Sequence, residues 1–207
     1  MHLETDKQKV IRFFEKFVEN YIVKDLTILH SIQPDAKTGL EGCTIPTAMT
    51  IISSMDLLGF LLNPNGETRK SKDNISYFFN FPNMRLFPTY YDNATLEKIF
   101  NYRHGMMHHF FPKFKGQFAG ICKNVESPEL FIYHEINGTE ENSLNVSVLT
   151  IDFFEALKKL KDFLQNSIDE KLFATIIKGL INLDYYFQIP NVTTTETTIN
   201  PGTPKNK

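Results

Sequence analysis

The chain has 207 residues, of which 42% are hydrophobic and 22% are charged, a composition typical of a globular protein of one domain. Its formal net charge of −2 excludes a global positive field, so binding of nucleic acid would depend on a local basic patch. Its two cysteines, Cys43 and Cys122, exclude a disulfide framework and a CxxC metal site.

The N-terminal segment is charged and has no apolar stretch of the kind that a signal peptide needs, so we expect a cytoplasmic location. Residues 7–30 carry apolar side chains three and four positions apart, with Lys and Glu between them, which predicts an amphipathic helix. The apolar residues of this segment are Val10, Phe13, Phe14, Phe17, Tyr21 and Ile22.

Residues 44–62 are apolar on nearly all sides, which predicts a central buried helix with Thr44 as its N-cap. The segment is short for a membrane span, and we expect no membrane association. Asp56 lies within it, beside Ser53 and Ser54. Two interpretations of Asp56 are open, a buried contact to a later helix or a position on a solvent-facing stripe, and we favour the second.

Two further helices are predicted before residue 112. Ser71 can cap a short helix through Phe79, and Asp92 or Asn93 can cap a helix that ends before Pro112. Just ahead of the second of these helices, the pair Tyr90–Tyr91 could stack on a nucleobase, but we favour packing for it.

The periodicity then changes. Alternating apolar residues predict strands at 118–122, 130–136 and 144–149, which together form a small antiparallel insertion at residues 116–149. Two closing helices are expected, the first at residues 151–165 and the second after a capping box from Ser167 to Glu170. The fold class is therefore mainly α, a single domain over residues 1–190, followed by a disordered tail at 191–207.

The segment Arg103–His109 holds one arginine and three of the chain's six histidines at the end of a predicted helix. Arginine is a permanent cation whose planar donors suit phosphate, and histidine takes and gives protons near neutral pH. This combination suits the cleavage of a phosphodiester. The paired methionines within the segment, Met106 and Met107, are expected to serve packing.

Helical geometry separates these side chains. His104 and His108 lie four residues apart and share a face, whereas Arg103 lies about 140° around the helix from His108. A second copy of the helix, facing the first across a two-fold axis, would bring both residue types into one cleft.

Arg103, the polar His104 and His108 match the motif of the HEPN superfamily, in which an arginine and a polar residue precede a histidine four to six positions after the arginine. His109 also falls in that window. The chain resembles this family over residues 5–112 and 151–187, and the insertion is not part of the family's core. The resemblance implies a HEPN-like helical bundle that forms a homodimer.

The resemblance also implies a metal-independent endoribonuclease, without cofactor, that leaves 2′,3′-cyclic phosphate ends on RNA and acts as a toxin or defence effector. His108 would be the general base or acid, Arg103 would stabilise charge on the scissile phosphate, and His104 would support them. His109 and Lys113 are further supporting residues. An antitoxin or nucleotidyltransferase-like protein is a possible partner.

Three alternatives stay open. The chain could be a non-catalytic HEPN-like dimer with a binding or regulatory role. His104 and His108 could bind zinc with His30 or His134, although no glutamate follows His104 as in the HExxH motif. The histidines could also simply cap the C-terminal end of a helix, where the helix dipole favours positive charge.

Overall fold

The computed structural model describes residues 4–33, 42–109, 113–114, 117–136 and 139–184. It is mainly helical with a small three-stranded sheet, as the sequence predicts. The predicted disordered tail at 191–207 lies outside the described residues. The helical segments are α1 (Asp6–Phe13), η1 (Phe14–Val23), α2 (Lys24–Ser31), α3 (Thr44–Leu62), α4 (Ser71–Phe79), α5 (Asn93–His109), α6 (Val146–Asn166) and α7 (Glu170–Asn182). The strands are β1 (Lys113–Phe114), β2 (Gln117–Phe118), β3 (Gly120–Cys122), β4 (Phe131–Ile136) and β5 (Thr139–Asn145).

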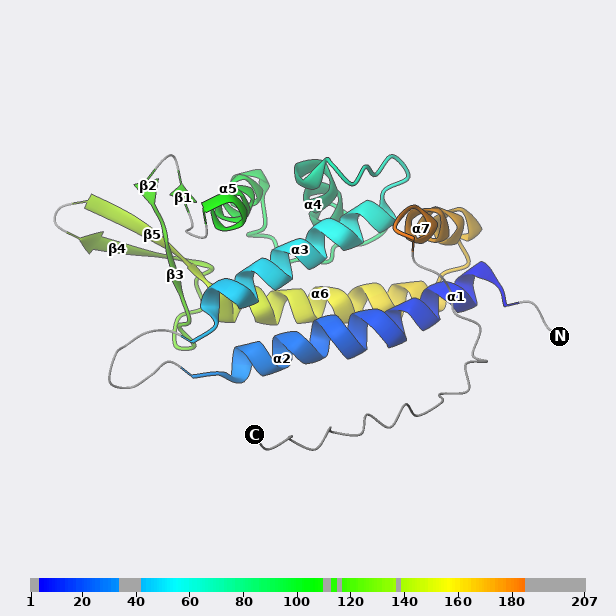
Figure 1. Cartoon of the computed structure of the whole chain (residues 1–207), viewed down its shortest axis with the longest axis horizontal. Coiled ribbons are helices and arrows are strands. Elements are labelled where there is room, and N and C mark those ends of the chain that lie inside the picture. Colours follow the sequence, from blue (N-terminus) through cyan, green and yellow to red (C-terminus); the bar gives the residue numbers. More distant parts are fainter. Residues whose placement is uncertain (1–3, 34–41, 110–112, 115–116, 137–138, 185–207) are drawn as a thin grey trace, which may run out of the picture.

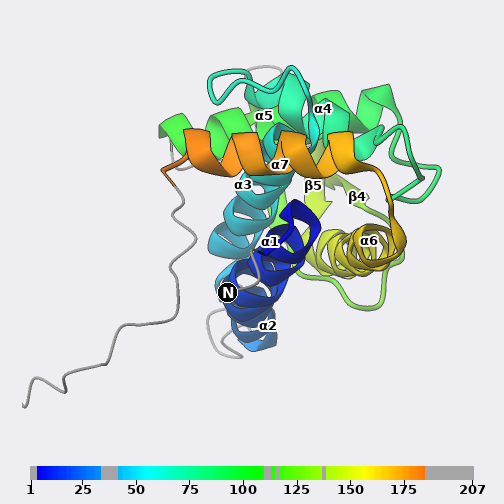
Figure 2. The same cartoon turned by 90° about the vertical axis from the view of Figure 1, so that its right-hand side faces the viewer.

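The helices run in two directions. The first three segments form one continuous helix, which extends along the long axis of the molecule together with α3 and α6 (Figure 1). The helices α5 and α7 cross this direction, so they appear end-on in Figure 1 and lengthwise in Figure 2. The sheet lies at one end of the long helices, beside α5.

The first helix contains a ten-residue π segment, η1, and the spacing of its buried residues explains why. Five buried residues follow one another at intervals of four. In an α-helix each such interval rotates the side chain by about 40°, because four residues exceed one turn of 3.6. The wider π turn rotates it back. The succession of α, π and α segments therefore keeps one stripe on the core, formed by Val10, Phe14, Val18, Ile22 and Leu26.

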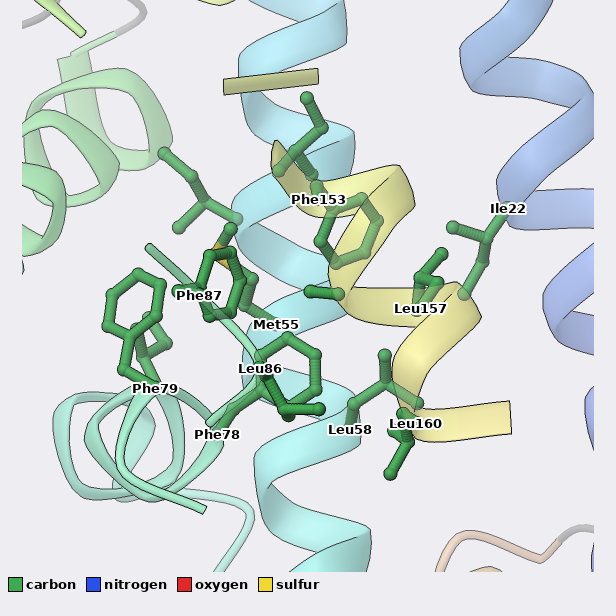
Figure 3. Close-up of a cluster of buried hydrophobic side chains, with 14 of the residues drawn as sticks. Ile22, Met55, Leu58, Phe78, Phe79, Leu86, Phe87, Phe153, Leu157 and Leu160 are labelled. Carbon is green, nitrogen blue, oxygen red and sulfur yellow. The ribbon is translucent and has the colours of Figure 1, made fainter. Parts of the chain in front are cut away.

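Helix α3 is the centre of the core, as its composition predicts. It is long and apolar enough to cross a membrane, but 61% of its most apolar window is buried inside the protein. Figure 3 shows Met55 and Leu58 of α3 surrounded by aromatic and aliphatic side chains of α4, α6 and the segment that follows α4. Phe78 packs edge-on against Phe87 and Phe153, with ring centroids 5.5 and 6.3 Å apart. Burial on this scale makes α3 a core helix.

The predicted antiparallel insertion is wrong in one pairing. Strands β4 and β5 form an antiparallel hairpin, but β3 pairs with β5 in parallel, and the order is β3-β5-β4. The chain must therefore cross from one edge of the sheet to the other after β3. The side chain of Asn145 holds this crossing segment, because its Nδ2 donates to the carbonyls of Asn124, Ser127 and Glu129 at 2.8–3.2 Å.

Two local predictions near the last helices are also wrong. The predicted strand at 144–149 ends at Asn145, whose side chain accepts a hydrogen bond from the Ser147 backbone N–H and starts α6 at Val146. Of its alternating apolar residues, Leu144 lies in β5, whereas Val146 and Val148 belong to a first helical turn that is buried throughout. The last helix is capped by Asp169, whose carboxylate accepts from the backbone N–H groups of Lys171 and Leu172 at 3.0 and 3.1 Å, in place of a capping box that begins at Ser167.

Candidate functional site

Helix α5 presents the Arg/His segment with one face inside and one outside. Tyr102 and Met106 are buried completely, whereas His104 and Met107 are exposed. The prediction that both methionines pack inward therefore holds for Met106 alone. The helix is started by Asp92, whose carboxylate accepts from the Thr95 backbone N–H at 2.8 Å.

Arg103 lies at the boundary between these faces and forms an ion pair with α3. Its Nη2 donates to Oδ2 of Asp56 at 3.1 Å, and the two side chains are only 20% and 16% exposed. The favoured interpretation of Asp56 as part of a solvent-facing stripe is therefore wrong. The alternative, a polar contact to the helix that carries the motif, is what the structure shows.

A third helix completes this arrangement. The second oxygen of Asp56 accepts from Nδ2 of Asn74 in α4 at 2.9 Å, and the same Nδ2 donates to the Glu67 carbonyl at 3.0 Å. Asn74 is 1% exposed. The carboxylate of Asp56 thus joins α3, α4 and α5 through hydrogen bonds in a largely buried setting, where such bonds are strong.

The guanidinium keeps hydrogen-bonding capacity. Within the described part of the chain, the buried Nε of Arg103 has no hydrogen-bond partner, and neither has Oδ1 of Asn74. Arg103 has five N–H donors in total, and the contact to Asp56 uses Nη2. The residue is therefore fixed in position without being fully satisfied.

The histidines of the motif lie on another side of the helix. His104 is exposed, and position 108 falls one turn later on the same face of α5. The side chains of His108, His109 and Lys113 lie outside what the structure describes. The described residues therefore show Arg103 brought to Asp56, and leave its approach to His108 a prediction.

A zinc site finds no support in the described residues, where no group of three or more potential ligands could hold a metal ion. His30, one of the candidate ligands, lies near the end of α2 with a buried Nδ1 that lacks a partner among those residues. Burial, and then the charge of Lys123, lower the pKa of His30. The side chain of His134 lies outside the described residues.

A second polar cluster was not predicted from the sequence. The hydroxyls of Tyr90 and Tyr91 both donate to Oδ2 of Asp152 in α6, at 2.5 and 3.0 Å. Burial raises the pKa of Asp152, although the two hydrogen bonds oppose this shift. The favoured packing role is confirmed for Tyr91, which is 8% exposed, but Tyr90 is 46% exposed. The only indication of this cluster in the sequence is Asp152 itself, a lone aspartate between the apolar residues Ile151 and Phe153.

The cluster and the ion pair together fix α5 against the core from both of its ends.

Comparison of the chain with models of known protein families, with curated proteins and with solved structures returns no match. The assignment of a function therefore depends on the residues and contacts of the chain itself.

Proposed function

We propose that the chain is a metal-independent endoribonuclease of HEPN type that acts as a homodimer and leaves 2′,3′-cyclic phosphate ends on RNA. One observation carries the proposal. Arg103 is held by Asp56 of another helix, at 3.1 Å, next to the exposed His104 and on the same helix as His108. A cation fixed in advance loses little conformational freedom when it binds a phosphate, which favours transition-state stabilisation.

The reaction needs only these groups. The 2′-hydroxyl of RNA attacks the adjacent phosphorus while an imidazole, that of His108, accepts its proton as general base. Negative charge grows on the non-bridging oxygens of the pentavalent phosphate, and Arg103 stabilises it. The bond to the 5′-oxygen breaks, and that oxygen leaves with a proton from an imidazolium acting as general acid. The exposed His104 would support these steps, with His109 and Lys113 adding positive charge.

The orientation of Arg103 favours a site shared between two subunits. Arg103 contacts α3, whereas His104 and position 108 lie on another face of α5. In a symmetric dimer, Arg103 of one subunit can meet His108 of the other in the same cleft. A toxin or defence role would then depend on an antitoxin or nucleotidyltransferase-like partner that controls the cleft.

The same ion pair favours a second candidate function, a non-catalytic HEPN-like dimer that binds or regulates a partner. Arg103 is 80% covered, and the Asp56 carboxylate neutralises part of its charge inside the subunit. In this alternative the ion pair holds three helices together and the histidines mark a helix end. The sheet insertion, predicted at 116–149, would then be the surface that contacts the partner, and its deletion short of Val146, where α6 begins, should abolish partner capture.

An RNA cleavage assay distinguishes the two. Purified protein is incubated with end-labelled RNA and EDTA, and new 5′-hydroxyl ends are detected by kinase labelling. The ribonuclease predicts cleavage by the wild type and a loss of roughly 10²–10⁴-fold in rate for His108→Ala, the range of general acid–base catalysis. Arg103→Ala should lose activity comparably, and Arg103→Lys should retain part of it if the variant folds.

The matched control is Lys72→Ala, because Lys72 forms an exposed ion pair with Glu97 elsewhere on the helices. It should cleave like the wild type. Absence of cleavage by the wild type, or equal cleavage by all variants, would overturn the ribonuclease and leave the binding function.

A further inference from the structure

A small pocket opens between the start of α5 and the first half of β4. Its volume is about 290 Å³, and the side chains that matter here are Tyr90, Thr95, Glu129, Phe131 and Tyr133. Ligand pockets for small molecules usually span roughly 300–1,000 Å³. A volume at the lower limit fits one planar ring system and excludes a large ligand.

Two tyrosines give this pocket fixed aromatic walls. The hydroxyl of Tyr90 donates to Asp152 at 2.5 Å, and the hydroxyl of Tyr133 accepts from Nζ of Lys98 at 2.9 Å. The residues are nevertheless 46% and 59% exposed. Each ring is therefore held at its polar end while much of its surface faces solvent, so a ligand that stacks on it loses little of its binding energy to ordering the protein.

Opposite charges accompany the rings. Nζ of Lys98 lies 4.7 Å from the ring centroid of Phe131 and 5.5 Å from that of Tyr133. Glu129 lines the pocket too. Burial is the main cause of the raised pKa of Tyr90, and Glu129 lies near enough for its charge to contribute. The pocket thus offers stacking surfaces and a carboxylate acceptor, and Lys98 places a cation beside two of its rings.

This combination matches one nucleotide of a single strand. Proteins recognise unpaired RNA bases by stacking them on aromatic rings and bonding their edges. A carboxylate accepts from an exocyclic amino group, which adenine, cytosine and guanine carry and uracil lacks. A lysine beside the rings suits the phosphate that follows the base.

The pocket and the Arg/His segment belong to one helix. Thr95 and Arg103 are eight residues apart on α5, which corresponds to about 12 Å along the axis. A strand of a few nucleotides spans that distance. We propose that the pocket between Tyr90 and Tyr133 binds one amino-bearing base of single-stranded RNA, a few nucleotides from the bond cut at Arg103. The choice of RNA as ligand rests on the proposed ribonuclease function.

Binding of 2′-O-methyl RNA hexamers tests this inference on the full chain, because these oligomers lack the nucleophile and stay intact. Fluorescence anisotropy should show that Tyr133→Ala weakens binding of oligo(A) about 5- to 150-fold, the effect of losing one stacked base. Tyr133→Phe keeps the ring and should stay within about threefold of the wild type. Tyr21→Ala removes another exposed tyrosine, 61% exposed on η1, and should leave affinity unchanged.

Base preference is the second readout. The wild type should bind oligo(A) and oligo(C) more tightly than oligo(U), and Glu129→Ala should abolish this difference. No binding by the wild type, equal affinity of wild type and Tyr133→Ala, or equal affinity for all three oligomers would overturn the proposal. If only the pocket proposal is wrong, the protein still cleaves natural RNA in EDTA. If only the ribonuclease proposal is wrong, the protein binds the oligomers but cleaves no RNA, so the two failures are distinguishable.

Discussion

Arg103 is placed where two tasks make different demands on one side chain. As a structural residue it must stay on Asp56, and as a catalytic residue it must offer donors to a phosphate. The ion pair uses Nη2, and the Nε is buried, so a phosphate would have to meet the part of the guanidinium that stays exposed. Stability and activity measured on the same variants therefore separate the two contributions.

A double-mutant cycle on Arg103 and Asp56 measures the structural part. Arg103→Ala should lower the free energy of unfolding by about 1–3 kcal/mol, because it leaves a mostly buried carboxylate without its cation. The double variant with Asp56→Ala should lose less than the sum of the single variants, by roughly 0.5–3 kcal/mol. Urea denaturation gives these values. Strict additivity would show that the ion pair contributes nothing to stability.

The pH dependence of stability should report on Asp152. Burial raises the pKa of Asp152, so the folded protein holds this proton more tightly than the unfolded chain does. The resulting stabilisation is present below the ordinary pKa of aspartate and is lost as pH rises through the raised value. Asp152→Asn keeps an acceptor for Tyr90 and Tyr91 but cannot titrate.

The free energy of unfolding of the wild type, minus that of Asp152→Asn, should therefore decrease as the pH rises above about 4, the ordinary pKa of aspartate. Thermal or urea unfolding at several pH values provides the measurement. A difference that stays flat or increases over this range would contradict the raised pKa.

At the scale of the site, the sequence predicts which residues share the motif helix, but it predicts few of the residues on other helices that contact them. The spacing of His104 and His108 predicts a shared face on a helix, and α5 extends through both positions. The partner of Arg103 is Asp56, which lies 47 residues away in the sequence. Asp56 in turn accepts a hydrogen bond from Asn74 of α4. Such contacts depend on how helices cross, which no local pattern encodes.

At the scale of the elements, periodicity predicted the helices well and their inward faces less well. The apolar periodicity places Tyr21 on the inward stripe of the first helix, but this residue is 61% exposed. The buried residues of the π segment follow one another at intervals of four, and Tyr21 lies outside that series. The mixed pairing of the sheet depends on the side chain of Asn145. Alternation along a strand indicates a buried face and says nothing of which neighbour pairs with it.

The crossing of α3 and α4 supplies a prediction about Gly59. A Cβ on Gly59 would lie 1.9 Å from the backbone carbonyl oxygen of Asn74, so Gly59→Ala must push the two helices apart. We expect a loss of about 1–3 kcal/mol in the free energy of unfolding, the cost of overpacking. Because Asn74 supports Asp56, RNA cleavage should fall as well.

Gly179→Ala in α7 is the matched control. Its Cβ would meet the end of the flexible Leu61 side chain at 2.9 Å, and alanine favours the helix by about 1 kcal/mol, so its net effect should be small. Urea denaturation of both variants compares them. Equal stability of the two variants would contradict the assigned role of the close approach at Gly59.

At the scale of the whole molecule, α3 joins the two directions of helices, and α5 lies across them with its Arg/His segment near the sheet (Figure 1). Arg103 contacts α3, and His104, the next residue, is exposed. Helical spacing places position 108 about 140° around α5 from Arg103, so one straight helix is not expected to aim both residues at one phosphate. The central claim is that a dimer brings them together.

Mixing two inactive variants tests this claim most directly. Arg103→Ala and His108→Ala proteins are combined, allowed to exchange subunits, and assayed for RNA cleavage in EDTA. If each site uses Arg103 of one subunit and His108 of the other, half of the dimers carry one complete site, and the mixture should regain about a quarter of the wild-type rate. A mixture that stays as inactive as its components, although subunit exchange is verified, would contradict the shared site.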